Sequence, residues 1–178
     1  MKKNILIFGL ISGLIVSSLI TITAICYTKK NFEGNMVLGF TVMILAFIFV
    51  FVGIKNYRDK FNNGYISFVK ALQIGLSISF IASTMYVITW LIAYYNFMPD
   101  FMEVMTAQGI EKIRLSKELT SIEIKDKIAG LNSMKELYKS PIMVILLTYM
   151  EIFPVGIVVT LISAVILKRK QNKDLNIA

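Results

Sequence analysis

The sequence predicts an all-α polytopic membrane protein: a four-transmembrane-helix bundle with an extramembrane helical hairpin between helices 3 and 4. Three observations predict this class: four long apolar runs, basic residues at the ends of these runs, and two amphipathic segments between the last two runs. An α-helix needs about 20 apolar residues to cross the roughly 30 Å hydrocarbon core of a bilayer. The runs that approach or exceed this length are residues 5–26, 36–54, 71–95 and 142–167.

The composition supports a membrane protein over a water-soluble one. The 178 residues are 56% apolar, and their mean hydropathy is +0.69. A soluble chain of this size has to present a charged surface and could not bury four such runs. We therefore predict a single membrane domain over residues 1–178.

The first apolar run resembles a signal peptide in one respect only. It follows Lys2 and Lys3, as the apolar region of a signal peptide follows basic residues. However, it is longer than the roughly 7–15 residues of such a region. Ile25, rather than a small residue, precedes Cys26, which argues against a lipoprotein anchor. We expect a retained transmembrane helix.

The distribution of basic residues predicts the orientation. With four spans, the N-terminus, the second connection and the tail at residues 168–178 share one side of the membrane. The basic residues on that side are Lys2, Lys3, Lys55, Arg58, Lys60, Lys70, Lys168, Arg169, Lys170 and Lys173. Only Asp59 and Asp174 oppose them. Because excess positive charge stays in the cytoplasm, we expect both termini to be cytoplasmic.

The long connection at residues 97–140 predicts a helical hairpin outside the membrane. Pro99 and Asp100 mark a first helix start, and Thr120 followed by Glu123 matches a capping box that starts a second helix. Apolar side chains follow at close to helical spacing: Ile124, Ile128, Leu131 and Tyr138. Ser140-Pro141 then begins the fourth span. We expect the hairpin to pack on the bundle, while the headgroup region or a partner are alternatives.

Small residues spaced four apart predict how the spans pack. Lipid gives apolar side chains no reason to leave it, so membrane helices associate through close backbone approach and polar contacts. Three runs carry such stripes: Gly9, Gly13, Ser17 and Thr21; Ala71, Gly75, Ser79 and Ser83; Gly156, Thr160 and Ala164. These stripes predict a compact bundle. The bulky run Phe47–Phe51 predicts a peripheral place for the second helix.

Glu151 is the one acidic or basic side chain inside an apolar run. Ten residues of helix after Pro141 place it about 15 Å deep, near the bilayer midplane. A carboxylate there costs about 3 kcal/mol, so we expect it to face the bundle interior. Pro154 cannot donate to the Met150 carbonyl and predicts a kink. Polar residues at a similar depth on other helices are Ser17, Ser83 and Thr84.

Three interpretations of Glu151 are open at this point. It can exchange a proton or cation during transport, as acids in kinked helices do in many transporters. It can recognise a partner helix. It can also be structural, staying protonated and donating a hydrogen bond within the bundle.

The residue inventory argues against catalysis and metal binding. The chain has no histidine and only one cysteine, which removes the usual zinc ligands and the commonest general base. It has neither a nucleophile-elbow motif nor a glycine-rich phosphate loop. We therefore predict no catalytic, metal-binding or cofactor-binding residue, and no enzyme. The basic residues act as topology signals, so no nucleic-acid partner is expected.

Three short elements resemble those of a bacterial multipass membrane family catalogued as domain of unknown function 4199. They are Gly64-Tyr65-Ile66-Ser67-Phe68-Val69-Lys70-Ala71, Met98-Pro99-Asp100 and Glu151-Ile152-Phe153-Pro154-Val155-Gly156. The resemblance covers nearly the whole chain and implies a small four-helix inner-membrane protein without established activity. It makes seven positions the first to test: Gly64, Phe68, Lys70, Pro99, Asp100, Glu151 and Pro154.

These observations favour a non-enzymatic interaction or accessory subunit. The alternative is a small oligomeric transporter or proton-linked channel that uses Glu151, because four spans would need to oligomerise to enclose a path. The expected partners are membrane lipids and either a second copy or another membrane protein.

Overall fold

The computed structural model describes residues 1–28, 36–116 and 119–169. Within these ranges the chain forms six α-helices and no β-strand, apart from one isolated antiparallel bridge between Ile66 and Arg169. The helices are α1 (Lys2–Thr28), α2 (Met36–Phe61), α3 (Phe68–Phe97), α4 (Phe101–Leu115), α5 (Ser121–Leu137) and α6 (Pro141–Leu167). Most of the basic tail lies outside the described residues.

Four of these helices are long and apolar enough to cross a membrane. The candidate spans are Lys2–Tyr27, Gly39–Phe61, Phe68–Phe97 and Pro141–Leu167. The prediction of an all-helical chain with four candidate spans is therefore confirmed. The second and third helices run past the apolar runs that predict them, because helical hydrogen bonding continues through the polar residues that follow or precede each run.

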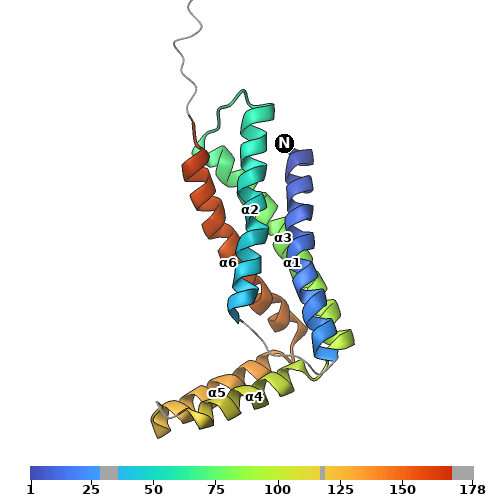
Figure 1. Cartoon of the computed structure of the whole chain (residues 1–178), viewed down its shortest axis with the longest axis vertical. Coiled ribbons are helices and arrows are strands. Elements are labelled where there is room, and N and C mark those ends of the chain that lie inside the picture. The colour runs from blue at the N-terminus through green and yellow to red at the C-terminus, as the bar shows by residue number, and fades with distance from the viewer. Residues whose placement is uncertain (29–35, 117–118, 170–178) are drawn as a thin grey trace, which may run out of the picture.

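The four long helices lie side by side and are called the bundle below (Figure 1). Helix α1 packs on α2 and α3, and α6 packs on α3 and α2, so each long helix has two main neighbours. Helices α4 and α5 pack on each other at one end of the bundle and extend sideways from it. The N-terminus of α1, the α2–α3 connection and the C-terminal end of α6 lie at the opposite end.

The core of the bundle is formed by large apolar side chains, and α2 supplies many of them. Phe47, Val50 and Ile54 of α2 are fully buried, together with Val16 of α1 and Ile78 of α3. The prediction of a peripheral α2 is therefore wrong. Its bulky residues fill the space between neighbouring helices, because Phe47 packs beside Gly156, where α6 offers no side chain.

The predicted small-residue stripes do lie at helix contacts. A Cβ atom built on Gly75 of α3 would lie 2.5 Å from the Thr160 side chain of α6. One built on Gly156 would lie 2.8 Å from Ser79 Cβ. The Ser79 hydroxyl donates to the Gly156 carbonyl at 3.3 Å and lies 3.2 Å from the Thr160 hydroxyl. Helices α3 and α6 thus approach closely and share polar contacts.

The stripe on α1 packs against α3 in the same manner. A Cβ on Gly9 would lie 2.9 Å from the Ile81 side chain. Further along, Thr89 of α3 donates a hydrogen bond to the Ser17 hydroxyl at 3.1 Å. The contact between α1 and α2 adds a hydrogen bond from the Ser12 hydroxyl to the Ala46 carbonyl at 2.9 Å.

The hairpin begins its second helix with the predicted capping box. The Glu123 N–H donates to the Thr120 hydroxyl, and the Glu123 carboxylate accepts from the Thr120 N–H at 2.8 Å. The apolar stripe of α5 is only half-buried, and no residue of α5 is fully buried. Lys135 pairs with Glu103 of α4 at 3.2 Å. The hairpin is thus held by local contacts between two largely exposed helices.

Replacing Gly156 with Ala should destabilise the bundle. Overpacking costs about 1–3 kcal/mol, which exceeds the roughly 1 kcal/mol that Ala gains over Gly in a helix, since Ser79 Cβ and the buried Phe47 ring cannot move freely. Thermal unfolding of the purified protein in detergent measures the loss. Gly39→Ala is the control, because nothing lies within 4 Å of a Cβ at that position. An equal effect of both variants would contradict this account of the α3–α6 contact.

The start of α5 should loosen as the pH falls. The Thr120 backbone N–H and hydroxyl donate to Glu123 and lower the pKa of its carboxyl. A lowered folded-state pKa stabilises the helix start above the unfolded-state pKa, and this stabilisation is lost as the pH falls through the folded-state value. Hydrogen exchange at residues 121–124 should therefore quicken, relative to the intrinsic rate, in acid. Glu123→Gln should remove this pH dependence, whereas Glu111→Gln on α4 should preserve it.

Candidate functional site on helix α6

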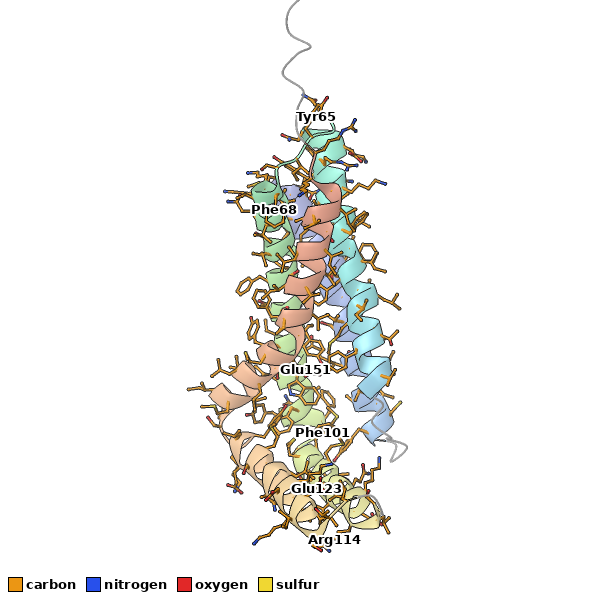
Figure 2. All side chains as sticks on the ribbon, turned by 90° about the vertical axis from the view of Figure 1, so that its left-hand side faces the viewer. Tyr65, Phe68, Phe101, Arg114, Glu123 and Glu151 are labelled. Atoms are coloured by element: carbon orange, nitrogen blue, oxygen red, sulfur yellow. The ribbon has the colours of Figure 1, made fainter. Side chains whose placement is uncertain are left out.

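Pro154 interrupts the hydrogen bonding of α6 in the middle of its length. It has no N–H to donate to the Met150 carbonyl, and its ring crowds that carbonyl. Figure 2 shows α6 bending at the level of Glu151, so that its first half leans away from the rest of the bundle. The predicted kink is therefore present, and Glu151 lies at it.

Glu151 does not face the interior of the bundle. Its side chain is exposed, whereas the next residue, Ile152, is fully buried. Among the described residues, the carboxylate of Glu151 forms no hydrogen bond or ion pair. The expectation of an inward-facing acid is therefore wrong. Ile152 and Thr148 occupy the buried face of α6, and Glu151 lies beside this face on the exposed surface of the helix.

None of the polar residues predicted at the depth of Glu151 forms a hydrogen bond with it. The Thr84 hydroxyl lies 2.8 Å from that of Tyr149 and donates to the Phe80 carbonyl. Ser17 accepts its hydrogen bond from Thr89. Ser83 is fully buried, and its hydroxyl has no partner within the described part of the chain. The structure therefore does not join these residues to Glu151 in one hydrogen-bonded site.

Two tyrosines lie within electrostatic range of Glu151 instead. Tyr86 is on α3 and is almost fully buried, and Tyr138 directly follows α5. Burial, and secondly the Glu151 carboxylate, raises the pKa of Tyr138 to about 12. The phenol of Tyr138 is therefore neutral, and available as a hydrogen-bond donor, at any physiological pH. The site that the structure assembles is an exposed carboxylate with the phenols of two tyrosines nearby.

Neither tyrosine is predicted from the sequence as a neighbour of Glu151. Tyr86 follows Ser83 by three residues, so the α3 stripe, continued by one turn, indicates its position. The spacing predicts only that Tyr138 lies on the apolar face of the hairpin. No signal along the chain connects it with Glu151, because that proximity depends on how α5 leads into α6.

An aromatic cluster joins the hairpin to the bundle beside this site. The Phe101 ring of α4 lies 5.2 Å from that of Trp90 and 5.8 Å from that of Tyr27. The Tyr94 ring lies 6.1 Å from that of Trp90 and 5.7 Å from that of Tyr138. Rings at these separations attract one another by about 0.5–1.5 kcal/mol a pair. The cluster therefore fixes the hairpin against α1 and α3.

The Pro99-Asp100 element lies at this same junction. The Tyr27 hydroxyl of α1 donates to the Asp100 carboxylate at 2.6 Å. Asp100 is also the residue that precedes α4, although its side chain does not cap that helix. These two positions therefore connect the end of α1 to the start of the hairpin.

The other resemblance positions lie at the far end of the bundle. Gly64 has a positive φ of 79°, which suits a glycine in the turn between α2 and α3. Phe68 and Lys70 are half-buried residues of the first turn of α3. Phe68 and Lys70 line a pocket far from Glu151. The seven positions chosen for testing therefore fall into two separate groups.

Metal-ligating side chains do not gather in the part of the chain that the structure describes. No group of three His, Cys, Asp or Glu residues is found there that could hold a metal ion. Cys26 is a free, partly exposed thiol.

Comparison with protein families gives one match. Residues 7–169 match the model described as "Protein of unknown function (DUF4199)". The chain belongs to this family. The match covers the hairpin, three candidate spans in full and the first span from residue 7 onward, and it confirms the resemblance seen in the sequence. Comparison with curated proteins and with solved structures gives no match.

Replacing Pro154 with Ala should straighten α6, because the new N–H can donate to the Met150 carbonyl. In a Cys26→Ser background, spin labels at two exposed positions, Met143 of α6 and Ile92 of α3, should then lie closer together. Pro141→Ala is the matched control, since a proline in the first turn blocks no helical hydrogen bond. Unchanged label distances in the Pro154 variant would show that packing, rather than the proline, bends the helix.

Proposed function

We propose that this chain is a non-enzymatic interaction protein, or accessory subunit, of the bacterial inner membrane, and that it contacts its partner through the exposed face of α6 around Glu151. One observation supports this proposal above all. Glu151 is exposed on an apolar candidate span and has no partner among the described residues.

The free energy of an unpaired carboxylate favours an intermolecular partner. Exposure to lipid near the midplane of a span costs about 3 kcal/mol, so such acids are almost always paired or face polar surroundings. A structural role would place a hydrogen-bonding partner for Glu151 within the chain. No described residue forms a hydrogen bond to Glu151, although Tyr86 and Tyr138 lie nearby, so the missing partner is best supplied by another molecule.

The surroundings of Glu151 indicate the chemistry of that partner. The exposed side chains nearest Glu151 along α6 are apolar: Met150 beside it, Pro154 one turn on and Val158 two turns on. A matching surface is a transmembrane helix that is apolar except for one hydrogen-bond donor or cation. Such a helix would remove Met150, which is 72% exposed, from lipid and would pair the carboxylate at the same time.

The arrangement of the helices supports a cytoplasmic position for both termini. The ends of α1, α2, α3 and α6 that carry most of the basic residues lie together, opposite the hairpin (Figure 1). Basic residues retained in the cytoplasm would place this end inside and the hairpin outside. The few buried residues of the hairpin fit a location in water or among lipid headgroups.

A second candidate is an oligomeric transporter or proton-linked channel. The observation in its favour is the proximity of three proton-bearing groups, on Tyr138, Glu151 and Tyr86. However, Val16, Phe47 and Ile78 fill the core of a single copy. A transport path would therefore have to run between copies of the chain.

The accessory proposal is tested by crosslinking in native membranes. A photoreactive residue in place of Met150 should recover a stoichiometric membrane protein, and adding Glu151→Ala should reduce this yield about tenfold or more, as expected for a lost buried charge pair. The same photoreactive residue in place of Leu14, exposed on α1, is the control. Recovery of self-contacts alone, or equal yields with and without Glu151, would contradict the proposal.

The transport alternative makes a different prediction for a conservative change. Glu151→Gln keeps the size of the side chain but removes its titration, so pH-dependent flux in proteoliposomes should disappear while the protein stays folded. Flux that survives this substitution would exclude Glu151 as the coupling group. Self-crosslinking through Met150 combined with loss of flux would favour the channel over the accessory subunit.

A further inference from the structure

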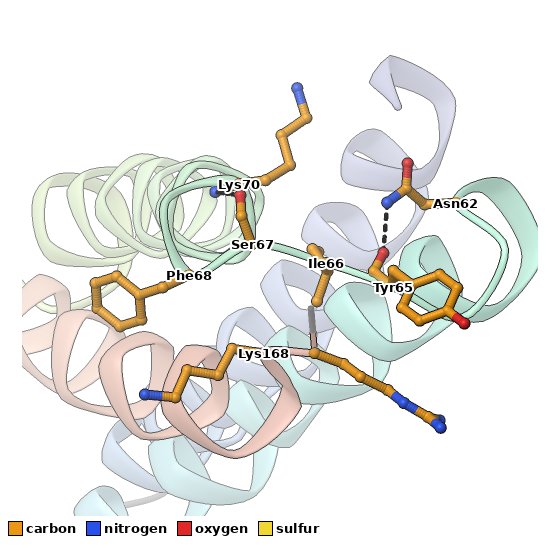
Figure 3. A pocket seen from close by; sticks show the side chains of 8 residues that line it. Asn62, Tyr65, Ile66, Ser67, Phe68, Lys70 and Lys168 are labelled. Atoms are coloured by element: carbon orange, nitrogen blue, oxygen red, sulfur yellow. Dashed lines mark hydrogen bonds between the residues drawn. The ribbon is translucent and has the colours of Figure 1, made fainter. Parts of the chain in front are cut away.

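A pocket of about 910 Å³ lies at the end of the bundle opposite the hairpin. It is formed where the α2–α3 connection meets the C-terminal end of α6 (Figure 3). Its lining includes three basic side chains, Lys70, Lys168 and Arg169, and the apolar side chains of Ile66 and Phe68. No acidic residue among those that the structure describes lines it. None of these features belongs to the Glu151 site.

The backbone around this pocket is held in place by hydrogen bonds. The Ile66 N–H donates to the Arg169 carbonyl at 3.1 Å, and the Arg169 N–H donates back to the Ile66 carbonyl at 2.9 Å. Ile66 itself is almost fully buried. The Ser67 hydroxyl accepts from the Lys70 N–H at 3.2 Å and caps α3. The pocket is therefore organised by main-chain bonds between segments that are about 100 residues apart along the chain.

The charges of the pocket are available for a ligand. Among the described residues Lys70 and Lys168 form no ion pair, and the Arg169 guanidinium lies 5.8 Å from the centre of the Tyr65 ring. Asp59 is within electrostatic range of Arg169, but its carboxylate is bound by Arg58 at 2.7 Å. Figure 3 shows Lys70 and Lys168 on different sides of the segment that carries Ser67 and Phe68. Three basic residues thus line a pocket that also contains apolar surface.

We propose that this pocket binds the phosphate group of an anionic phospholipid. Basic side chains attract phosphate, and the N-terminal end of α3, a helix of 30 residues, adds to this attraction. The position favours a lipid over a soluble phosphate. The pocket lies where three candidate spans end, at Phe61, Phe68 and Leu167, which is the depth of the headgroups.

The apolar part of the pocket fits the same ligand. Phe68 is half-buried beside the basic residues, and the neighbouring Val69 is 61% exposed. An acyl chain that continues from the bound phosphate can follow this surface along α3 into the membrane. With a soluble phosphate bound instead, this apolar surface would stay in contact with water.

The test is lipid binding by the full chain in detergent micelles, measured by native mass spectrometry. The probes are phosphatidylglycerol, which is anionic, and phosphatidylcholine, which is zwitterionic. We expect the chain to retain phosphatidylglycerol. The triple variant Lys70→Gln, Lys168→Gln and Arg169→Gln should bind it about tenfold more weakly or worse, since each basic residue near a membrane adds appreciably to the binding of anionic lipid. Micelles remove any effect of these charges on membrane orientation.

The matched control removes three charges at the same end of the bundle but outside the pocket. Lys2, Lys3 and Lys60 are exposed, and none of them lines it. Their triple replacement by Gln should change phosphatidylglycerol binding by less than about twofold. Equal losses in both triple variants would mean diffuse attraction and would overturn the proposal, as would undiminished binding in the pocket variant.

Two further measurements separate the remaining outcomes. Inorganic phosphate and glycerol 3-phosphate are added as competitors, and displacement of the lipid by either at equal concentration would identify a soluble phosphate as the ligand instead. The variant Lys70→Arg, Lys168→Arg and Arg169→Lys keeps every charge and should retain binding. If the neutral triple variant does not fold, Lys70→Gln alone is compared with Lys60→Gln, and no difference between these two would overturn the proposal.

Discussion

The close approach of α3 and α6 is the contact on which the rest of the structure depends. It requires that neither helix carries a bulky side chain where Gly75 and Ser79 meet Gly156 and Thr160. In lipid, where apolar side chains gain nothing by leaving their surroundings, contact of this kind and the hydroxyl hydrogen bonds along it hold helices together. Phe47 of α2 packs against the same place, so three of the four long helices meet there.

The α3–α6 contact also holds one half of the kinked helix α6 in place. The half of α6 after Pro154 is held against α3, while the half before it leans away (Figure 2). Glu151 lies at the change of direction, outside the closely packed region, and near Tyr138 at the end of the hairpin. The Glu151 carboxylate therefore stays exposed beside a closely packed half-helix, as the proposed docking surface requires.

Most positions that carry the family resemblance lie at connections between helices. Gly64 forms the turn into α3, and Asp100 receives the Tyr27 hydrogen bond where α3 passes into the hairpin. A turn with positive φ and a hydrogen-bonded contact between helix ends each accept few residue types, whereas the lipid-facing surface of a span accepts any large apolar residue. Connections of this kind therefore contain recognisable short elements, whereas the spans between them are almost uniformly apolar.

The sequence by itself determined the fold class, the four candidate spans, the capping box at Thr120 and the small-residue stripes. Each of these depends on local composition or on spacing along one helix. Only the tertiary structure decided that Phe47 lies in the core, that Glu151 faces outward, and that Lys70 shares a pocket with Arg169. The rotation of one helix against its neighbours, and the pairing of residues a hundred positions apart, result from the packing of all four helices at once, and no segment read alone contains that information.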